Sequence, residues 1–396
     1  MSWNRMLHKK KFRLANIILA IFSVMVSYST LVIGDYAVRK VASGSNSLIL
    51  SESQNIIDKR KIEIDQPERL VARKAGFSSL IYPAIFDENE NLIRLTNRLK
   101  IAPIGSQPNT KTYYCNEGYG LVRFTSDKYG LRNPNHKWDQ PADTFFIGDS
   151  ITHGACVEDA ETIPAQYEDI VKKNILNLGS PANNPYHYAA LAKIFIPIYQ
   201  PKNIVLIFYP GDFGDFNNSN LYKFYVTQDQ SLIYQNSSGK FQLPKKYNLL
   251  HKNKEWDAQN LEKHKPSTLF MILYTLRKHA SLPFIRQIIF PKSILKKYFN
   301  PSAIAIKNTE ELCEQYGCKL TVVYIPNSHF FDLNAYADYY ENLLHAYAKS
   351  RSINFVSLTK KFDRGKNSKD YAPKGHHLSP FGYNKVAVAI SNSLNY

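Results

Sequence analysis

The stretch from Thr144 to Val157 has the sequence TFFIGDSITHGACV. Its apolar run, Phe145–Ile147, predicts a short buried strand that ends at Gly148. Ser150 follows at once, at the place where a parallel α/β sheet presents a nucleophile beyond the end of a strand. Gly148 allows the backbone to turn sharply there. The alternative interpretation is that Gly-Asp-Ser forms an ordinary turn, as these residue types do freely.

Apolar strand patterns alternate with helical patterns from Asp143 onward. The predicted strands are Thr144–Ile147, Ile175–Leu178, Ile204–Tyr209, Leu320–Ile325 and Ile353–Leu358. The predicted helices are Ile163–Lys173, His187–Tyr199, Ala303–Tyr316, Ala335–Lys349 and Pro380–Leu394. This repetition predicts an α/β fold of three layers, α/β/α, with a mostly parallel five-stranded sheet.

The N-terminal residues predict a membrane anchor. Residues 1–13 carry five Lys and Arg and no acidic residue, and residues 14–34 carry no charge at all. Such a span is long enough to cross a hydrocarbon core of about 30 Å as a helix, and the basic tail should stay in the cytoplasm. We therefore expect a single-pass protein of the inner (cytoplasmic) membrane, with its C-terminal domain in the periplasm or outside. A cleaved signal peptide is the competing interpretation.

The composition of the chain limits the classes of partner that we expect it to bind. The net charge of +17 favours anionic surroundings, and no nucleic-acid-binding motif is recognisable, so we expect no nucleic-acid partner. The four cysteines allow three pairings. We expect Cys115 to pair with Cys156, because Cys156 flanks the Ser150 turn and Cys115 begins the segment before it. No Cys-x-x-Cys pair occurs, so no metal is predicted, and nothing implies an organic cofactor.

Chemically capable residues follow the successive predicted strands. Ser150 follows the first strand, Gly179 ends the second in Asn-Leu-Gly, and Gly211-Asp212 follows the third. His377 lies in the segment HHLSPFGY, residues 376–383. Since the carboxyl ends of parallel strands meet at one edge of a sheet, these positions should converge there.

These ordered blocks resemble the SGNH (GDSL-type) hydrolase family, in particular its membrane-anchored bacterial members. The segment SDKYGLRN, residues 126–133, is also similar to that of such members. The resemblance covers about residues 112–220 and 301–396, and it implies an SGNH/flavodoxin-like sheet. It divides the chain into a basic tail (1–13), a transmembrane anchor (14–34), a linker and accessory region (35–141), and a catalytic domain (142–396) with an insertion at 222–300.

The resemblance also implies roles for individual residues. Ser150 would be the nucleophile and His377 the base that takes its proton, since a serine hydroxyl needs such a base. The N–H groups of Ser150 and Gly179 would hold the oxyanion. His153 and Asp149 are expected to serve packing and the turn, and His376 a structural or substrate-contact role.

Two positions depart from the family pattern. Asp212 stands where the family has an asparagine, and an ionised carboxylate cannot donate a hydrogen bond to the oxyanion. Either Asp212 is protonated, or Asn183, Asn184 or Asn217 supplies the donor. Lys374 stands where the family often has the aspartate that orients the histidine. Asp370 is the nearest upstream carboxylate, and a Ser-His dyad that uses a backbone carbonyl is the alternative.

The expected function is that of a serine-dependent acyl ester hydrolase acting on an acylated cell-envelope glycan or a related ester. An O-acyltransferase that modifies an exported polysaccharide is the first alternative, because it uses the same acyl-serine step. A catalytically weakened glycan-binding or assembly protein is the second, because of Asp212 and Lys374. Within the insertion, apolar and basic stretches over 252–300 predict either a lid over the site or helices on an anionic membrane surface.

Overall fold

We analysed a computed structural model of the chain. It describes residues 23, 25–34, 67–79, 85–86, 92–93, 101–103, 105–106, 108–181, 183–214, 222–226, 232–236, 239–242, 292–327, 336–363 and 368–394. The chain divides into two compact units, one of residues 1–60 and 265–291 and one of residues 61–264 and 292–396. In the first unit the described residues, 23 and 25–34, are helical. None of the helices described is both long enough and apolar enough to span a bilayer.

The second unit is built on a parallel sheet of five strands in the order β14-β13-β9-β7-β8. The strands are β7 (Thr144–Gly148), β8 (Ile175–Gly179), β9 (Asn203–Phe208), β13 (Lys319–Tyr324) and β14 (Asn354–Ser357). The five predicted strands and their parallel arrangement are confirmed, with ends that shift by at most one residue. β7 lies between β8 and β9, so the turn that carries Ser150 leaves the sheet one strand in from the β8 edge.

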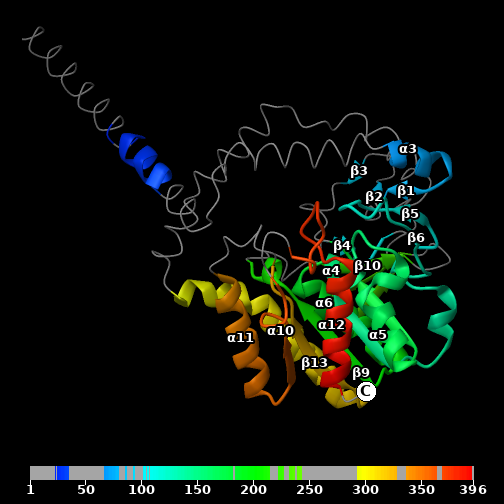
Figure 1. The fold of residues 1–396 in the computed structure, drawn as a ribbon. Helices are drawn as coiled ribbons and strands as arrows, with labels where there is room; N and C mark the ends of the chain where they lie inside the picture. Colours follow the sequence, from blue (N-terminus) through cyan, green and yellow to red (C-terminus); the bar gives the residue numbers. More distant parts are fainter. Residues whose placement is uncertain are drawn as a thin grey trace, which may run out of the picture. The chain divides into compact units, whose positions relative to one another are not determined.

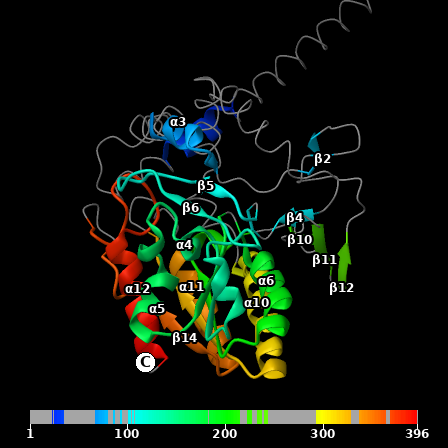
Figure 2. The same cartoon turned by 90° about the vertical axis from the view of Figure 1, so that its right-hand side faces the viewer.

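Two layers of helices cover the sheet, and the predicted three-layer α/β architecture is confirmed (Figures 1 and 2). One face packs against α6 (Pro185–Tyr199), α10 (Lys292–Tyr316) and α11 (Tyr336–Ser350), and the other against α5 (Ile163–Val171) and α12 (Pro380–Ser393). The strands supply both cores because successive side chains point to opposite faces. In β7, for example, Phe145 lies in one core and Phe146 in the other, and both are fully buried.

The starts of the helices follow capping chemistry that the sequence contains. Asn184 caps α6 through a hydrogen bond from the Tyr186 N–H, and Thr162 caps α5 in the same way. Ser379 accepts a hydrogen bond from the Gly382 N–H at 2.9 Å, with Pro380 as the first helical residue of α12. This capped start fixes the position of His377 two residues upstream. The helix α10 begins at Lys292, earlier than the predicted Ala303, and continues through Pro301.

The region before the sheet forms small strands in the same compact unit as the sheet. A hairpin of β5 (Lys111–Tyr113) and β6 (Arg123–Thr125) pairs with β1 (Ser78–Ser79), which follows helix α3 (Pro67–Lys74). A second pair consists of β2 (Ile85–Phe86) and β3 (Leu92–Ile93). The loop of this hairpin lies between residues 113 and 123.

The segment 126–133 attaches this region to the edge of the sheet. The Asn133 side chain makes the hydrogen bonds that a neighbouring strand would make. Its Oδ1 accepts the Asn177 N–H at 2.8 Å and its Nδ2 donates to the Asn177 carbonyl at 2.9 Å. Arg132 donates to the carbonyls of Gly154 and Val157 behind the Ser150 turn. Because edge strands expose unpaired backbone groups, the Asn133 side chain satisfies groups of β8 that the sheet leaves open.

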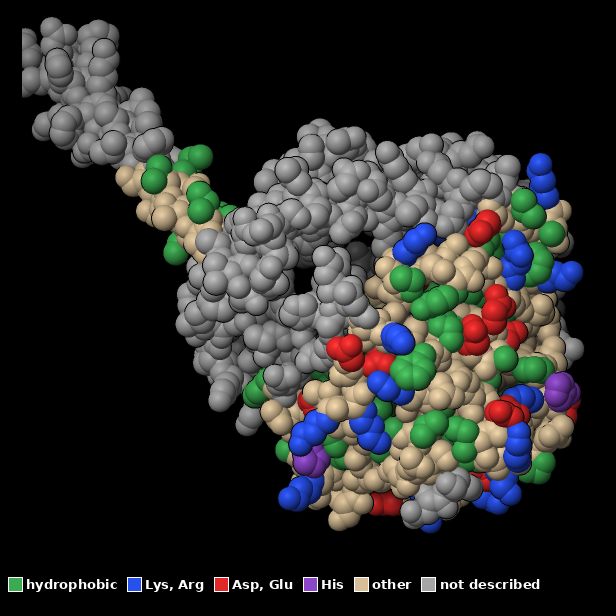
Figure 3. Space-filling model, viewed as in Figure 1, with side chains coloured by type: hydrophobic (Ala, Val, Ile, Leu, Met, Phe, Trp, Pro, Cys, Tyr) green, Lys and Arg blue, Asp and Glu red, His purple; other side chains and the backbone are tan. Residues whose placement is uncertain are grey.

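The insertion begins with a three-stranded meander. Strands β10 (Tyr222–Val226), β11 (Leu232–Asn236) and β12 (Gly239–Gln242) are antiparallel, and β10 pairs in parallel with β4 (Ile101–Pro103). The predicted lid or membrane-surface helices fall mostly on residues outside those described. On the face shown in Figure 3, Lys and Arg side chains alternate with Asp and Glu over the described surface. That face therefore presents mixed charge.

Candidate active site

Ser150 is the first residue of the short helix α4 (Ser150–His153), directly after β7. The carboxylate of Asp149 caps this helix by accepting the Ile151 N–H at 3.0 Å. Burial raises the pKa of Asp149 to about 6, although the Ile151 N–H and the nearby His377 oppose the rise. The N–H of Ser150 has no acceptor within the helix, because the first N–H groups of every helix lack one. Ser150 thus combines a hydroxyl and a backbone donor at the sheet edge.

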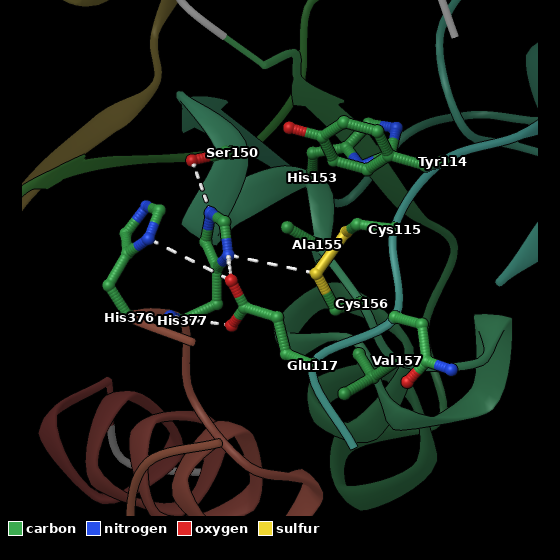
Figure 4. Close-up of a disulfide and its surroundings, with 12 residues drawn as sticks. Tyr114, Cys115, Glu117, Ser150, His153, Ala155, Cys156, Val157, His376 and His377 are labelled. Carbon is green, nitrogen blue, oxygen red and sulfur yellow. Dashed lines mark hydrogen bonds and ion pairs between the residues drawn. A yellow bond between two sulfur atoms is a disulfide. The ribbon is translucent and has the colours of Figure 1, made fainter. Parts of the chain in front are cut away.

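Ser150, His377 and Glu117 form a continuous hydrogen-bonded chain (Figure 4). The Ser150 Oγ and the His377 Nε2 lie 3.0 Å apart, and the His377 Nδ1 lies 3.0 Å from the Glu117 Oε1. All three side chains are nearly enclosed. The expected approach of Ser150 and His377 is therefore found. The third member is a residue that the sequence interpretation did not name.

Glu117 holds His377 at two points. Its Oε1 faces the imidazole Nδ1, and its Oε2 accepts the main-chain N–H of His377 at 3.0 Å. A carboxylate at Nδ1 favours the tautomer that carries its proton there, which leaves Nε2 free to accept the Ser150 proton. The Glu117 carboxylate lies directly over Gly375, where an added Cβ would be 1.6 Å from its carboxyl carbon. A residue without a side chain is required at position 375 for this contact.

The predicted acid, Asp370, has a different position. Both of its carboxylate oxygens bind the Lys385 ammonium of α12 at 2.8 Å, and one also accepts the Asp363 N–H. The segment folds back on itself through the bridge between Tyr371 and Leu378, which turns the Asp370 carboxylate toward α12. Asp370 is thus an anchor for α12, and the choice of Asp370 to orient His377 has to be corrected to Glu117.

Gly179 also has a role different from the expected one. Its N–H donates to the Asn177 Oδ1 at 2.9 Å, so it is already engaged within β8. An added Cβ at Gly179 would lie 2.3 Å from the main-chain nitrogen of His153. The glycine in Asn-Leu-Gly therefore allows α4 to pack closely on the end of β8, and the geometry does not support its assignment as an oxyanion donor.

Asp212 lies in the short 3-10 helix η3 (Pro210–Asp212), next to Ser150 in the same cavity. Its Oδ1 accepts the Tyr188 hydroxyl at 2.7 Å and its Oδ2 accepts the Tyr209 N–H at 3.0 Å. Burial, helped by the negative charge of Asp149, raises the pKa of Asp212 well above its ordinary value, against the opposing effect of the two hydrogen bonds. Burial therefore favours the neutral form of Asp212, which reduces the negative charge beside the oxyanion region.

The cavity around Ser150 measures about 350 Å³. Its lining residues are mostly polar or aromatic: Tyr114, Asp149, Ser150, Asn183, Asn184, Tyr209, Gly211, Asp212, His376 and His377. It unites most of the residues predicted for the site. Asn217, the third asparagine considered as a donor, lies outside the described residues.

The remaining histidines fit their expected roles. His153 is buried, and its ring makes edge contacts with Tyr114 and Phe124 at centroid distances of 5.8 and 5.1 Å. Burial lowers its pKa well below the ordinary value, so it is a neutral packing residue. His376 is partly exposed, stacks near the His377 ring at 4.0 Å, and has its Nδ1 3.8 Å from Glu117.

Among the described residues, Glu117, His376 and His377 can each offer one ligand atom within 4.8 Å of the others. Their chemistry would suit a transition metal ion. However, His377 already uses Nδ1 for Glu117 and Nε2 for Ser150, so a metal ion bound to either ring nitrogen would replace one of these hydrogen bonds. The arrangement fits a proton relay better than a metal centre.

Both pairs of cysteines form disulfides. Cys115 and Cys156 are bonded with a Cα–Cα distance of 5.0 Å, which confirms the predicted pairing, and Cys313 is bonded to Cys318. The first disulfide lies beside the relay, where the Cys156 Sγ is 3.8 Å from the His377 Nδ1 (Figure 4).

Comparisons with known proteins give weak likenesses. No protein-family model matches the chain, and no curated protein is significantly similar in sequence. Among solved structures, the chain is similar to a protein described as lipolytic and of the G-D-S-L family from Desulfitobacterium hafniense, with 11% identity over 64% of this chain and 99% of that one, and a TM-score of 0.38.

Two further solved structures are described in similar terms. A GDSL-like lipase from Bacteroides thetaiotaomicron is 13% identical over 67% of this chain and 92% of its own, with a TM-score of 0.34. AlinE4, an SGNH-hydrolase family esterase, is 12% identical over 65% of this chain and 96% of its own, with a TM-score of 0.30. These values are too low to assign a family, so the function has to be inferred from the geometry of the site.

The raised pKa of Asp212 predicts a pH-dependent effect of the substitution Asp212→Asn. Folded Asp212 keeps its proton after the unfolded chain has lost it, so wild-type stability falls as the pH rises from about 4 toward the raised pKa. The Asp212→Asn variant does not lose stability in this way. In wild type the loss of folding free energy amounts to about 1.4 kcal/mol per pH unit at most. We expect its melting temperature, relative to wild type, to increase with pH.

Asp139→Asn serves as the matched control, since the Asp139 side chain is 72% exposed. Its melting temperature relative to wild type should show a much smaller trend over the same pH range. If the difference between Asp212→Asn and wild type is independent of pH, Asp212 is not the neutral acid described above.

Proposed function

We propose that the protein is a serine-dependent acyl ester hydrolase of SGNH type. The observation that carries this proposal is the buried chain of hydrogen bonds from Ser150 through His377 to Glu117, with both contacts at 3.0 Å. Nucleophile, base and orienting acid lie within the distances that proton transfer requires. The lysine at position 374, in place of an orienting aspartate, favoured a weakened binding protein. Glu117 supplies the missing carboxylate.

The geometry supports a two-step reaction. His377 accepts the Ser150 proton as the oxygen attacks the ester carbonyl, and Glu117 stabilises the imidazolium that forms. The Ser150 N–H, together with an amide of Asn183 or Asn184 in the same cavity, would hold the oxyanion. His377 then gives the proton to the departing alcohol, which leaves an acyl group on Ser150. In the second step, water attacks the acyl group while His377 takes its proton. His377 then returns the proton to the Ser150 oxygen, and the carboxylic acid leaves.

The cavity favours a short acyl group on a polar alcohol. None of the described residues lining it has an aliphatic side chain, so a long acyl chain would gain little from entering it. The tyrosines Tyr114 and Tyr209 offer aromatic surfaces with hydroxyl groups, which suit a sugar. We therefore place the substrate among acylated carbohydrates, such as those of a cell envelope. A sugar hydroxyl replacing water in the second step would make the protein an O-acyltransferase, the second candidate.

The substitution Glu117→Gln tests the proposed relay. It removes the negative charge that stabilises the imidazolium, so we expect kcat/KM for an aryl acetate to fall by about 10³–10⁴. Ser150→Ala should abolish both hydrolysis and labelling by a fluorophosphonate probe. The measurements use the full chain, purified in detergent.

Asp370→Asn is the matched control, since it also converts a buried carboxyl of this region to an amide. It should lower the melting temperature, because Lys385 loses its partner, while kcat changes little. A loss with Asp370→Asn as large as that with Glu117→Gln would return the role of acid to Asp370. Full activity of Ser150→Ala would refute the proposed function.

The length of the acyl chain should strongly affect kcat/KM for ester hydrolysis. A groove lined by aliphatic side chains would gain about 0.8 kcal/mol for each buried CH₂ group, whereas the described lining of this cavity contains no aliphatic side chain. We expect kcat/KM for aryl esters to be highest for acetate and to fall steadily toward octanoate. An increase toward octanoate would contradict the short-acyl assignment.

The N-terminal segment supplies the proposed location. The basic residues before Leu14 and the uncharged span after it favour a single-pass anchor in the inner membrane, with the site outside the cytoplasm. A reporter that is active only in the periplasm should give a signal when it is fused after Tyr396. A signal from a cytoplasmic reporter alone would refute this topology.

A further inference from the structure

Glu117 lies in the loop of the β5–β6 hairpin, outside the sheet that carries Ser150. Within this loop, the Asn116 Oδ1 accepts the N–H groups of Gly118 and Gly120, and the Cys115 carbonyl accepts the Val122 N–H. These hydrogen bonds shape the loop but do not fix it against the nucleophile. A loop is usually a mobile place for a residue that must hold a distance to within a fraction of an ångström.

The Cys115–Cys156 disulfide joins this loop to the nucleophile turn. Cys115 is two residues before Glu117, and Cys156 is six residues after Ser150. Both cysteines are buried in a small apolar cluster with Ala155. The Ala155 carbonyl also accepts the Tyr383 hydroxyl of α12, the helix that follows His377. The disulfide thus lies where the segments of acid, nucleophile and base meet.

The disulfide also contacts the base. The Cys156 Sγ lies 3.8 Å from the His377 Nδ1, the same nitrogen that faces Glu117 (Figure 4). The sulfur therefore occupies the space on one side of the Glu117–His377 contact. Loss of the bond would release the loop and open space into which Glu117 or the imidazole could shift.

We propose that Cys115 and Cys156 are positioning residues that hold Glu117 against His377. This inference rests on the proposed function, since it assigns a source for the geometry of the relay. The disulfide acts through Glu117 and contributes nothing to catalysis when the acid is absent. This property separates a positioning role from a general contribution to stability.

A double-mutant cycle in the full chain tests the proposal. Replacing both cysteines by serine should lower kcat for an aryl acetate by about 10–10², because a displacement of about 1 Å can cost that much. The same replacement in the Glu117→Gln background should cost less than threefold, since the group being positioned is already lost. Removing the other disulfide, with Cys313→Ser and Cys318→Ser, should leave kcat unchanged.

The substitution Gly375→Ala should displace Glu117 while the disulfide stays intact. Its Cβ would push the Glu117 carboxylate off its place, so the loss in kcat should be similar and again vanish in the Glu117→Gln background. If the cysteine variant does not fold, the alanine pair Cys115→Ala and Cys156→Ala replaces it. A downfield proton resonance from the His377 Nδ1–H should be present in wild type and weakened in both the cysteine and Gly375 variants.

The outcomes separate the two proposals. If the cysteine replacement costs the same factor with and without Glu117, or costs nothing, the positioning role is refuted while the relay stands. If instead Glu117→Gln retains full activity, the proposed relay itself fails, whatever the cysteine variants do.

Discussion

A buried carboxylate that binds one histidine at two points is the contact on which this site depends. Glu117 is 2% exposed, and an enclosed carboxylate costs several kcal/mol unless its oxygens are fully engaged. The main-chain N–H and the ring of His377 provide that engagement. Because both partners belong to one residue, the contact fixes the position of the backbone as well as the orientation of the imidazole.

Several features of the chain support this contact. Gly375 leaves room for the carboxylate, the Tyr371–Leu378 bridge folds the segment back, and the Ser379 cap starts α12 at a defined point. The cap and the bridge both lie within the short segment that carries the base, and Glu117 orients its ring. The sheet instead provides the nucleophile, through the tight packing of α4 on β8 at Gly179.

The electrostatic arrangement around Ser150 is asymmetric. Three carboxyl groups lie near it, yet they differ in their environments. Glu117 faces an imidazole, whereas burial raises the pKa values of Asp149 and Asp212. Like charges at short range repel strongly in a medium of low dielectric constant, so the raised pKa of Asp212 in particular reduces the negative charge that gathers around Ser150.

The sheet could be predicted from sequence because buried parallel strands are continuous apolar runs, and the motif residues that follow them could be placed at its edge. Ser150 and Asp212 were found for that reason, whereas His377 was found through the family resemblance of the segment 376–383. Glu117 was not, because it lies 260 residues from His377 in the chain and in a hairpin loop with no periodic pattern. The predicted Cys115–Cys156 pairing was the one available signal, since it brings residue 117 near the Ser150 turn. Asp370 was chosen by proximity in sequence, which says nothing about where a folded-back segment turns its side chains.

The order of the three relay residues along the chain has a consequence for biosynthesis. Glu117 and Ser150 leave the ribosome early, whereas His377 follows Ser150 by 227 residues, beyond the insertion and four further strands of the sheet. A partly synthesised chain therefore carries a serine without a base, and its hydroxyl stays a poor nucleophile. Reactivity arises only when the last strand and α12 have folded onto the sheet. Under the proposed function, the growing chain would therefore be unable to attack esters until its C-terminal segment has folded.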